Sequence, residues 1–273
     1  MKIISNPLEL KEYLKTVEGS IGFVPTMGAL HEGHISLIKK ARAQNEIVVV
    51  SIFVNPTQFL KGEDLDNYPS RDEADKKICA LAHVDILFLP TKHAIYTSDE
   101  VSLLAPKVRG FVLEGATRPG HFNGVLTVVM KLLNLVNPTK AYFGKKDAQQ
   151  LNLITLMVKQ LFMSVEIVPV ETVRDSDGLA KSSRNVYLTQ EQRVEALKVS
   201  KSLHEASKMV SRGIYNVSSI KESMLNILVP LEVAYVEVLN RDFEIIEEIE
   251  LGKSVILVEV LVGRTRLLDN IWI

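Results

Sequence analysis

Short apolar runs rich in β-branched residues alternate, over the first two thirds of this chain, with segments of helical periodicity. Several of these runs are apolar almost throughout, as in strands buried on both faces of a sheet. The strand candidates are residues 21–25, 46–55, 84–90, 141–144 and 165–170, and the helix candidates between them are residues 34–44, 71–81, 122–136 and 147–161. This alternation predicts an α/β fold with a parallel sheet and right-handed crossovers. In such sheets ligands bind beyond the carboxyl ends of the strands.

The pattern changes after about residue 173. The polar segment 174–185 leads into a long helix pattern, which a capping box of Thr189 and Gln192 opens and Gly213 closes. A shorter helix at 219–228 and strand-like runs at 234–240, 254–262 and 266–273 follow. We therefore expect two domains, residues 1–175 and a smaller α+β domain of residues 176–273.

Composition excludes several classes of protein. The 273 residues carry a net charge of −1, from 32 basic and 33 acidic side chains, so no basic excess indicates a nucleic-acid surface. The longest apolar run covers residues 47–54, far short of the roughly 20 residues that span a membrane. The single Cys79 can form neither an internal disulfide nor a zinc framework. With no signal peptide evident, we expect a soluble cytoplasmic protein.

A glycine- and histidine-containing turn joins the first predicted strand to the first predicted helix in "FVPTMGALHEGHISLIKKA". Gly28 allows close approach of a ligand, and a helix beginning near His34 offers an anion site at its N-terminus. His31 and His34 can donate hydrogen bonds to phosphate oxygens. Two alternatives stay open: a metal site, which lacks a nearby third ligand, and a loop histidine beside a capping histidine.

Gln58 follows a strand end in "SIFVNPTQF". Its amide both donates and accepts, which suits a substrate that carries a carboxylate and a hydroxyl. A polar residue that only stabilises the turn is the alternative.

A second glycine-containing region covers residues 115–151, where Gly120 and Gly124 mark a loop that enters a helix near Phe122. The strand near Tyr142 then ends in "GKKDAQQ", in which Lys146 supplies a point charge for phosphate. The adjacent Asp147 could bond a ribose hydroxyl or help to hold Mg²⁺. A solvated helix start is the alternative.

The segment "DGLAKSSRN" places two cations and two hydroxyls in four residues, 181–184. This composition indicates a phosphate clamp on a mobile segment, or else a charged surface turn. Neither a P-loop nor a dinucleotide-binding glycine fingerprint occurs, which disfavours a P-loop kinase and a dehydrogenase.

Five segments, in this order, resemble the pantoate–β-alanine ligase family: "PTMGALHEGH", "FVNPTQF", "RPGHFNGVLTVVMKLLNLVNP", "YFGKKDAQQ" and "DGLAKSSRNVYL". The C-terminal "YVEV" and "GRTRLLDN" match as well, so the resemblance covers nearly the whole chain. It implies an ATP-dependent ligase that joins (R)-pantoate to β-alanine through a pantoyl-adenylate, and releases AMP and pyrophosphate. It also implies a homodimer, a Mg²⁺ requirement, a Rossmann-like ATP- and pantoate-binding domain and a C-terminal lid domain.

The resemblance also assigns roles to residues. His34 would be the proton donor with His31 as its partner, and Lys146 and Lys181 would act with them. Gln58 and Gln150 would hold pantoate and β-alanine. The ATP-binding residues would be Met27, Gly28, Ala29, Leu30, His31, Glu32, Gly33, His34, Gly144, Lys145, Lys146, Asp147, Val173, Lys181, Ser182, Ser183 and Arg184.

Some points stay open within this assignment. The magnesium ligands are unknown, because Asp64 and Asp66 fit an exposed acidic loop as well as a metal site. Lys145 and Ala148 depart from the family pattern, in which an acidic and an aromatic residue are common. Another nucleotidylyltransferase with the same H-x-G-H element is the nearest alternative function, and a nucleotide-binding sensor without catalysis is a second.

Overall fold

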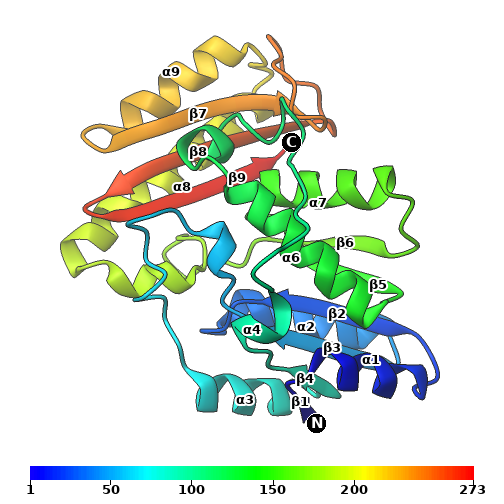
Figure 1. The fold of residues 1–273 in the computed structure, drawn as a ribbon. Helices are drawn as coiled ribbons and strands as arrows, with labels where there is room; N and C mark the ends of the chain where they lie inside the picture. The colour runs from blue at the N-terminus through cyan, green and yellow to red at the C-terminus, as the bar shows by residue number, and fades with distance from the viewer. The chain divides into compact units, whose positions relative to one another are not determined.

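The computed structural model describes all 273 residues, and the chain divides into two compact units (Figure 1). The first unit consists of residues 1–144 and 153–171, and the second of residues 145–152 and 172–273. Helix α7 (Ala148–Gln160) therefore contributes residues to both units. The predicted assignment of residues 1–175 and 176–273 as an ATP-binding domain and a lid stays a prediction.

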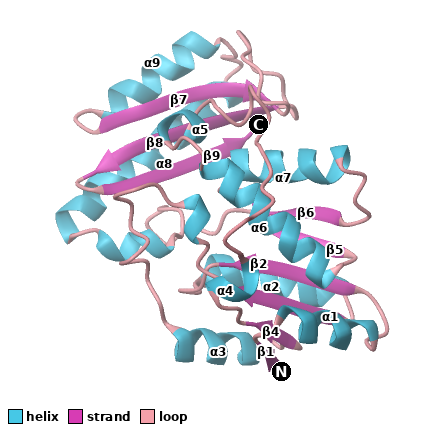
Figure 2. Cartoon of the chain, in the orientation of Figure 1, coloured by secondary structure: helices cyan, strands magenta, loops and turns pink.

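A six-stranded parallel sheet with the order β1-β4-β3-β2-β5-β6 forms the centre of the first unit (Figure 2). Its strands are β1 (Lys2–Ile4), β2 (Ile21–Thr26), β3 (Ile47–Ile52), β4 (Ile86–Phe88), β5 (Lys140–Gly144) and β6 (Glu166–Val170). The central strand β3 is buried over four consecutive residues, because both of its faces are covered. The predicted α/β class with a parallel, Rossmann-like sheet is confirmed.

Helices cover both faces of this sheet. The helices of the first unit are α1 (Pro7–Lys15), α2 (Glu32–Gln44), α3 (Asp72–Leu81), α4 (Lys92–Ile95), α5 (Glu114–Thr117) and α6 (His121–Val136), with a 3₁₀ turn η1 (Pro56–Gln58). Leu37, Ile38 and Ala41 of α2 and Cys79 of α3 pack in one core cluster with β-strand residues, including Tyr142. α6 contacts β2 and α1.

The second unit contains a three-stranded antiparallel sheet with the order β7-β8-β9. Its strands are β7 (Glu232–Asn240), β8 (Ser254–Val262) and β9 (Thr265–Trp272), and its helices are α8 (Gln190–Ser211) and α9 (Val217–Leu228), with a 3₁₀ turn η2 (Ser183–Tyr187). α8 and α9 pack on the sheet around one apolar core that contains Leu203, Met224 and Val258 (Figure 2). The predicted capping box of Thr189 and Gln192 opens α8, so that prediction is confirmed.

Two local predictions were wrong, and two elements were not predicted. β1 and α1 were not predicted, because elements of only three and nine residues show little hydrophobic periodicity. α2 begins at Glu32 rather than near His34. Gly124 lies inside α6 and marks no loop, because the helix begins at His121.

No helix of the chain has both the length and the apolar character needed to cross a membrane.

Candidate active site

The turn between β2 and α2 adopts a backbone conformation that requires glycine at one position. Gly28 has φ +89°, and a Cβ atom there would lie 3.1 Å from Ile52 Cγ2 and 3.2 Å from Asp75 Oδ2. Ala29 follows with φ +50°, an uncommon left-handed conformation for a residue with a side chain. The Gly28 N–H donates to Thr26 Oγ1 at 3.3 Å. The backbone is therefore turned back sharply at the carboxyl end of the central sheet.

Asp75 of α3 holds this turn from within the protein. Its Oδ2 accepts a hydrogen bond from the Ala29 N–H and its Oδ1 accepts one from the Leu30 N–H, both at 2.8 Å. Asp75 is only 1% exposed. Burial raises the pKa of its carboxyl above the ordinary value, although the two N–H donors act in the opposite direction. The left-handed turn is therefore fixed by a carboxylate that lies 45 residues beyond Leu30 in the chain.

Sequence reasoning missed Asp75, although a signal was present. Asp75 lies on the same helical face as Ile78, Cys79 and Ala82, all of which join the apolar core. A carboxylate in an apolar stripe has to be paired or hydrogen-bonded, because its desolvation is otherwise too costly.

The two histidines cap α2 reciprocally. His31 is the N-cap residue, and its Nδ1 accepts from the Gly33 N–H at 3.1 Å. His34 Nδ1 accepts from the His31 N–H at 3.3 Å, which completes a capping box. Since each Nδ1 accepts a hydrogen bond, both neutral rings carry their proton on Nε2. The imidazoles accept from two backbone N–H groups at this helix end, those of His31 and Gly33, and the predicted anion site there stays a prediction.

The structure thus shows that the histidines cap the helix. This role uses only Nδ1 of each ring, so the Nε2–H donors needed for the predicted phosphate contacts are kept. The ring centroids lie 4.1 Å apart. Each ring keeps its N–H donor at Nε2, on the side of the ring away from the cap. No group of three or more His, Cys, Asp or Glu side chains forms a metal-binding cluster, and neither Asp64 nor Asp66 belongs to one.

Gln58 lies beside the glycine turn. It ends the 3₁₀ turn η1 that follows β3, and its Nε2 donates to Met27 Sδ at 3.1 Å. Asn55 Nδ2 donates to Gln58 Oε1 at 3.0 Å, and Asn55 is itself 1% exposed. The structure therefore brings two of the predicted site residues, Met27 and Gln58, into contact, and Asn55 fixes which end of the Gln58 amide donates.

A buried histidine and an ion pair support η1. His121 Nδ1 donates to the Gln58 carbonyl oxygen at 2.7 Å, and Arg118 Nη1 donates to His121 Nε2 at 3.1 Å. Arg118 also forms a two-pronged ion pair with Glu63, at 2.6 and 2.5 Å. Burial, and then the Arg118 charge, lower the pKa of His121 to about 4. His121 is therefore neutral, with its proton on Nδ1.

Glu63 completes this network. Burial raises the pKa of Glu63, but the hydrogen bonds from Arg118 and from the Leu60 N–H outweigh burial and hold that pKa below its ordinary value. The segment "RPGHFNG" is part of the family resemblance, but the sequence assigns no role to Arg118 or His121. Nothing in the local pattern links these residues to Gln58, which lies 60 and 63 positions earlier in the chain.

Close packing of α6 on η1 explains Gly124. A Cβ atom at this position would lie 2.3 Å from the Thr57 carbonyl oxygen and 2.7 Å from the Gln58 backbone nitrogen. Any side chain here would displace the turn that carries Gln58.

The second unit contains the other predicted residues in two segments. Lys146 and Asp147 precede α7, and their side chains form an ion pair at 3.3 Å. Gln150 lies in the first turn of α7. Gly144, the last residue of β5, belongs to the first unit.

The segment from Val173 to Arg184 folds back on itself. The Lys181 N–H donates to the Val173 carbonyl oxygen at 2.9 Å, so these two predicted residues are neighbours. Lys181 Nζ pairs with Asp175 at 2.5 Å, and Arg193 pairs with the same carboxylate at 2.8 Å. Hydrogen bonds from Arg193 and Lys181 hold the pKa of Asp175 below its ordinary value. Ser182 caps η2 by accepting from the Arg184 N–H at 3.3 Å.

A sequence profile described as Pantoate-beta-alanine ligase matches residues 2–272. The chain belongs to the pantoate–β-alanine ligase family. A pantothenate synthetase of Sulfurimonas denitrificans is 70% identical over 273 residues, which cover 100% of both chains. Membership makes this chain an enzyme of the ligase class, as the sequence predicted.

Two solved structures of the family are similar to the chain. The pantothenate synthetase of Thermus thermophilus has a TM-score of 0.95 and 39% identity, with 100% of this chain and 99% of that chain covered. The pantoate-β-alanine ligase of Francisella tularensis, complexed with β-γ ATP and β-alanine, has a TM-score of 0.84 and 35% identity. That comparison covers 100% of this chain and 97% of that chain.

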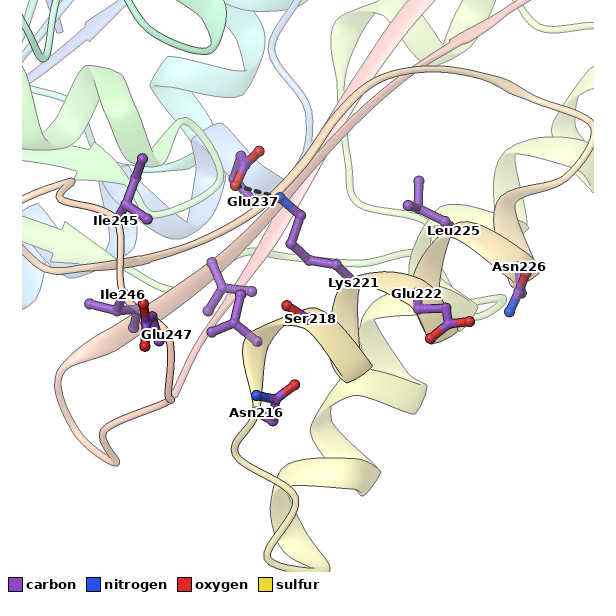
Figure 3. Close-up of a pocket in the computed structure, with 12 residues that line it drawn as sticks. Asn216, Ser218, Lys221, Glu222, Leu225, Asn226, Glu237, Ile245, Ile246 and Glu247 are labelled. Carbon is purple, nitrogen blue, oxygen red and sulfur yellow. Dashed lines mark hydrogen bonds and ion pairs between the residues drawn. The ribbon is translucent and has the colours of Figure 1, made fainter.

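The second unit also contains a pocket of about 760 Å³ (Figure 3). It is lined by α9, by β7 and by residues 245–247, and Lys221 pairs with Glu237 across it at 2.8 Å. None of its lining residues belongs to the predicted site.

Proposed function

We propose that this member of the pantoate–β-alanine ligase family condenses (R)-pantoate with β-alanine in two steps at the residues that the sequence predicted. The pantoate carboxylate first attacks the α-phosphorus of ATP, which forms pantoyl-adenylate and expels pyrophosphate. The β-alanine amine then attacks the acyl carbon and AMP leaves. The glycine- and histidine-containing turn is the observation that carries the proposal, because it holds two oriented N–H donors and contacts, through Met27, the Gln58 amide that suits pantoate.

The first step needs no general base, because a carboxylate is ionised at neutral pH. Catalysis then depends on positioning and on stabilising charge on the phosphates and on the departing pyrophosphate. The Nε2–H groups of His31 and His34 would donate to these oxygens, with His34 as the proton donor. Their orientation is fixed before ATP binds, since the capping bonds to Nδ1 hold both rings.

Gln58 and Gln150 would bind pantoate and β-alanine. In the structure Gln58 Oε1 accepts from Asn55 and Gln58 Nε2 contacts only the Met27 sulfur, a weak acceptor. The Nε2 donor of Gln58 is therefore the atom that a substrate carboxylate or hydroxyl would recruit.

The ATP contacts would come from residues 27–34, Gly144 to Asp147, Val173 and residues 181–184. Lys146 and Lys181 would oppose the phosphate charge. Both are paired with aspartates in the structure, at 3.3 Å and 2.5 Å, so each would exchange a carboxylate partner for a phosphate oxygen when ATP binds.

Mg²⁺ would arrive with the ATP phosphates. The chain has no cluster of three acidic or histidine ligands, which fits an ion held mainly by phosphates, water and one carboxylate such as that of Asp147. When bound, the ion would supply charge neutralisation on the polyphosphate. We further propose a homodimer in the cytoplasm, where ATP is available and a single thiol stays reduced.

Pyrophosphate release tests this function. The protein is given ATP and Mg²⁺, then pantoate, then β-alanine, and the products are identified by mass. We expect pyrophosphate with pantoate alone, and pantothenate with AMP after β-alanine is added. A stable nucleotidyl product that ignores β-alanine would identify another H-x-G-H nucleotidylyltransferase, and ATP binding without pantoate-dependent release would identify a sensor.

A further inference from the structure

The C-terminal motif "GRTRLLDN" has no role in the proposed chemistry, yet its last residue contacts the segment that carries Lys146. Asn270 lies on β9 and is 3% exposed. Its Nδ2 donates to the Lys145 carbonyl oxygen at 3.0 Å and to the Lys146 carbonyl oxygen at 2.6 Å. One amide thus holds two consecutive peptide groups that lie 125 and 124 positions away in the chain.

Only the NH₂ group of the Asn270 side chain forms hydrogen bonds. Asn270 Oδ1 is buried and has no hydrogen-bond partner. A buried acceptor without a partner is costly, so the two bonds made by Nδ2 have to offset that cost. Asparagine therefore serves at this position as a donor to the backbone of residues 145 and 146.

The preceding residue of the motif ties a second segment to the same strand. Asp269 is 4% exposed and accepts two hydrogen bonds from Arg174, at 2.5 and 3.0 Å. Arg174 follows Val173 directly, and Val173 is bonded to Lys181. Neighbouring residues of β9 therefore fix both segments of the second unit that contain predicted ATP-binding residues.

We propose that Asn270 is a positioning residue for Lys146, and that it sets the backbone from which the lysine reaches the phosphates of ATP. This inference rests on the proposed function. The side-chain hydrogen bonds of Asn270 go to the carbonyl groups of residues 145 and 146, so it acts through these groups. A small displacement of a charge-stabilising group is enough to cost about 10²-fold in rate.

Asn270→Asp is the isosteric test. The new carboxylate would face two carbonyl oxygens, so both hydrogen bonds would be lost and replaced by repulsion between oxygen atoms. Once protonated, the same carboxyl could donate one O–H to a carbonyl and restore part of the contact. Burial, the two carbonyl dipoles and neighbouring Asp269 favour protonation, whereas Arg174, Lys145 and Lys146 oppose it.

The measurement is pantoate-dependent pyrophosphate release by the full chain, followed as a function of pH. At pH 8 we expect Asn270→Asp to lose about 10- to 100-fold in kcat, and we expect the loss to shrink as the pH falls towards 6. Asn270→Ala, which cannot regain a donor, should show a loss that is constant over the same range. Asn226→Asp on α9, an exposed site, is the matched control and should behave as wild type.

Three outcomes separate the possibilities. Wild-type activity of Asn270→Asp at pH 8, or the same pH profile for both Asn270 variants, would overturn the inference. If Asn270→Asp does not fold, a wild-type rate for a folded Asn270→Ala would overturn it instead. Absence of pantoate-dependent release in the wild type would remove the proposed function itself, and is recognised before any variant is made.

Discussion

The imidazole of His34 accepts a hydrogen bond from the backbone of His31 while His31 caps the same helix, so each residue fixes the other. Both Nδ1 atoms are committed to the cap, and both Nε2 atoms carry the donor proton. A structural role and a chemical role therefore occupy opposite nitrogens of the same ring, and substitutions can separate them.

His34→Asn should remove activity with little change in stability. Asparagine places an acceptor near the position of Nδ1 but nothing near Nε2, so the cap survives and the phosphate donor is lost. We expect pantoate-dependent pyrophosphate release to fall by about 10²–10³-fold, as for other oxyanion donors. His34→Gln, which reaches the Nε2 position, should retain more activity. His93→Asn, at an exposed histidine, is the control, and a normal rate for His34→Asn would remove His34 from the mechanism.

Asp75→Asn should loosen the glycine turn. The Asn amide has one oxygen, so it can accept from only one of the N–H groups of Ala29 and Leu30. Its NH₂ group would face the other N–H, and two donors repel each other. We expect stability to fall by about 1–3 kcal/mol, and kcat to fall by about 10- to 100-fold because the histidines are displaced. Hydrogen exchange should accelerate at residues 28–31. Asp72→Asn on the same helix is exposed and should change neither quantity; unchanged exchange at 28–31 in Asp75→Asn would contradict the account.

His121 should make the protein sensitive to acid. Its pKa is about 4 in the folded protein and about 6.5 when unfolded, so the unfolded state gains a proton first as the pH falls. The contribution of neutral His121 to the free energy of unfolding is fully present above about pH 6.5. It is lost as the pH falls towards 4, by about 3 kcal/mol in total.

Denaturant unfolding at several pH values checks this. The free energy of unfolding of His121→Asn should fall less steeply between pH 6.5 and 4 than that of the wild type. The parallel variant His93→Asn should follow the wild type. Equal slopes for His121→Asn and wild type would show that His121 does not stay neutral in the fold.

Gly124→Ala should weaken pantoate binding. The added methyl group would overlap the backbone of Thr57 and Gln58, which must then move. Overpacking of this kind costs about 1–3 kcal/mol of stability. We expect a raised KM for pantoate and a smaller effect on the KM for ATP. Asn134→Ala, at an exposed position of the same helix, is the control and should leave both KM values unchanged. Unchanged KM values for Gly124→Ala would show that α6 does not position Gln58.

The sequence by itself determined the fold class, the family and the identities of the predicted site residues. Strand and helix periodicity are local properties, so a parallel sheet followed by a small α+β unit could be predicted from apolar spacing. The family motifs are contiguous segments, so they identify the family without tertiary information.

Only the tertiary structure decided how these residues are held. Asp75 meets Ala29 across 46 positions, His121 meets Gln58 across 63, and Asn270 meets Lys146 across 124. Each contact joins a side chain to a backbone group, and backbone groups carry no sequence signal. Their partners are set by how the elements pack, which is why the supporting residues appear only when the chain is folded.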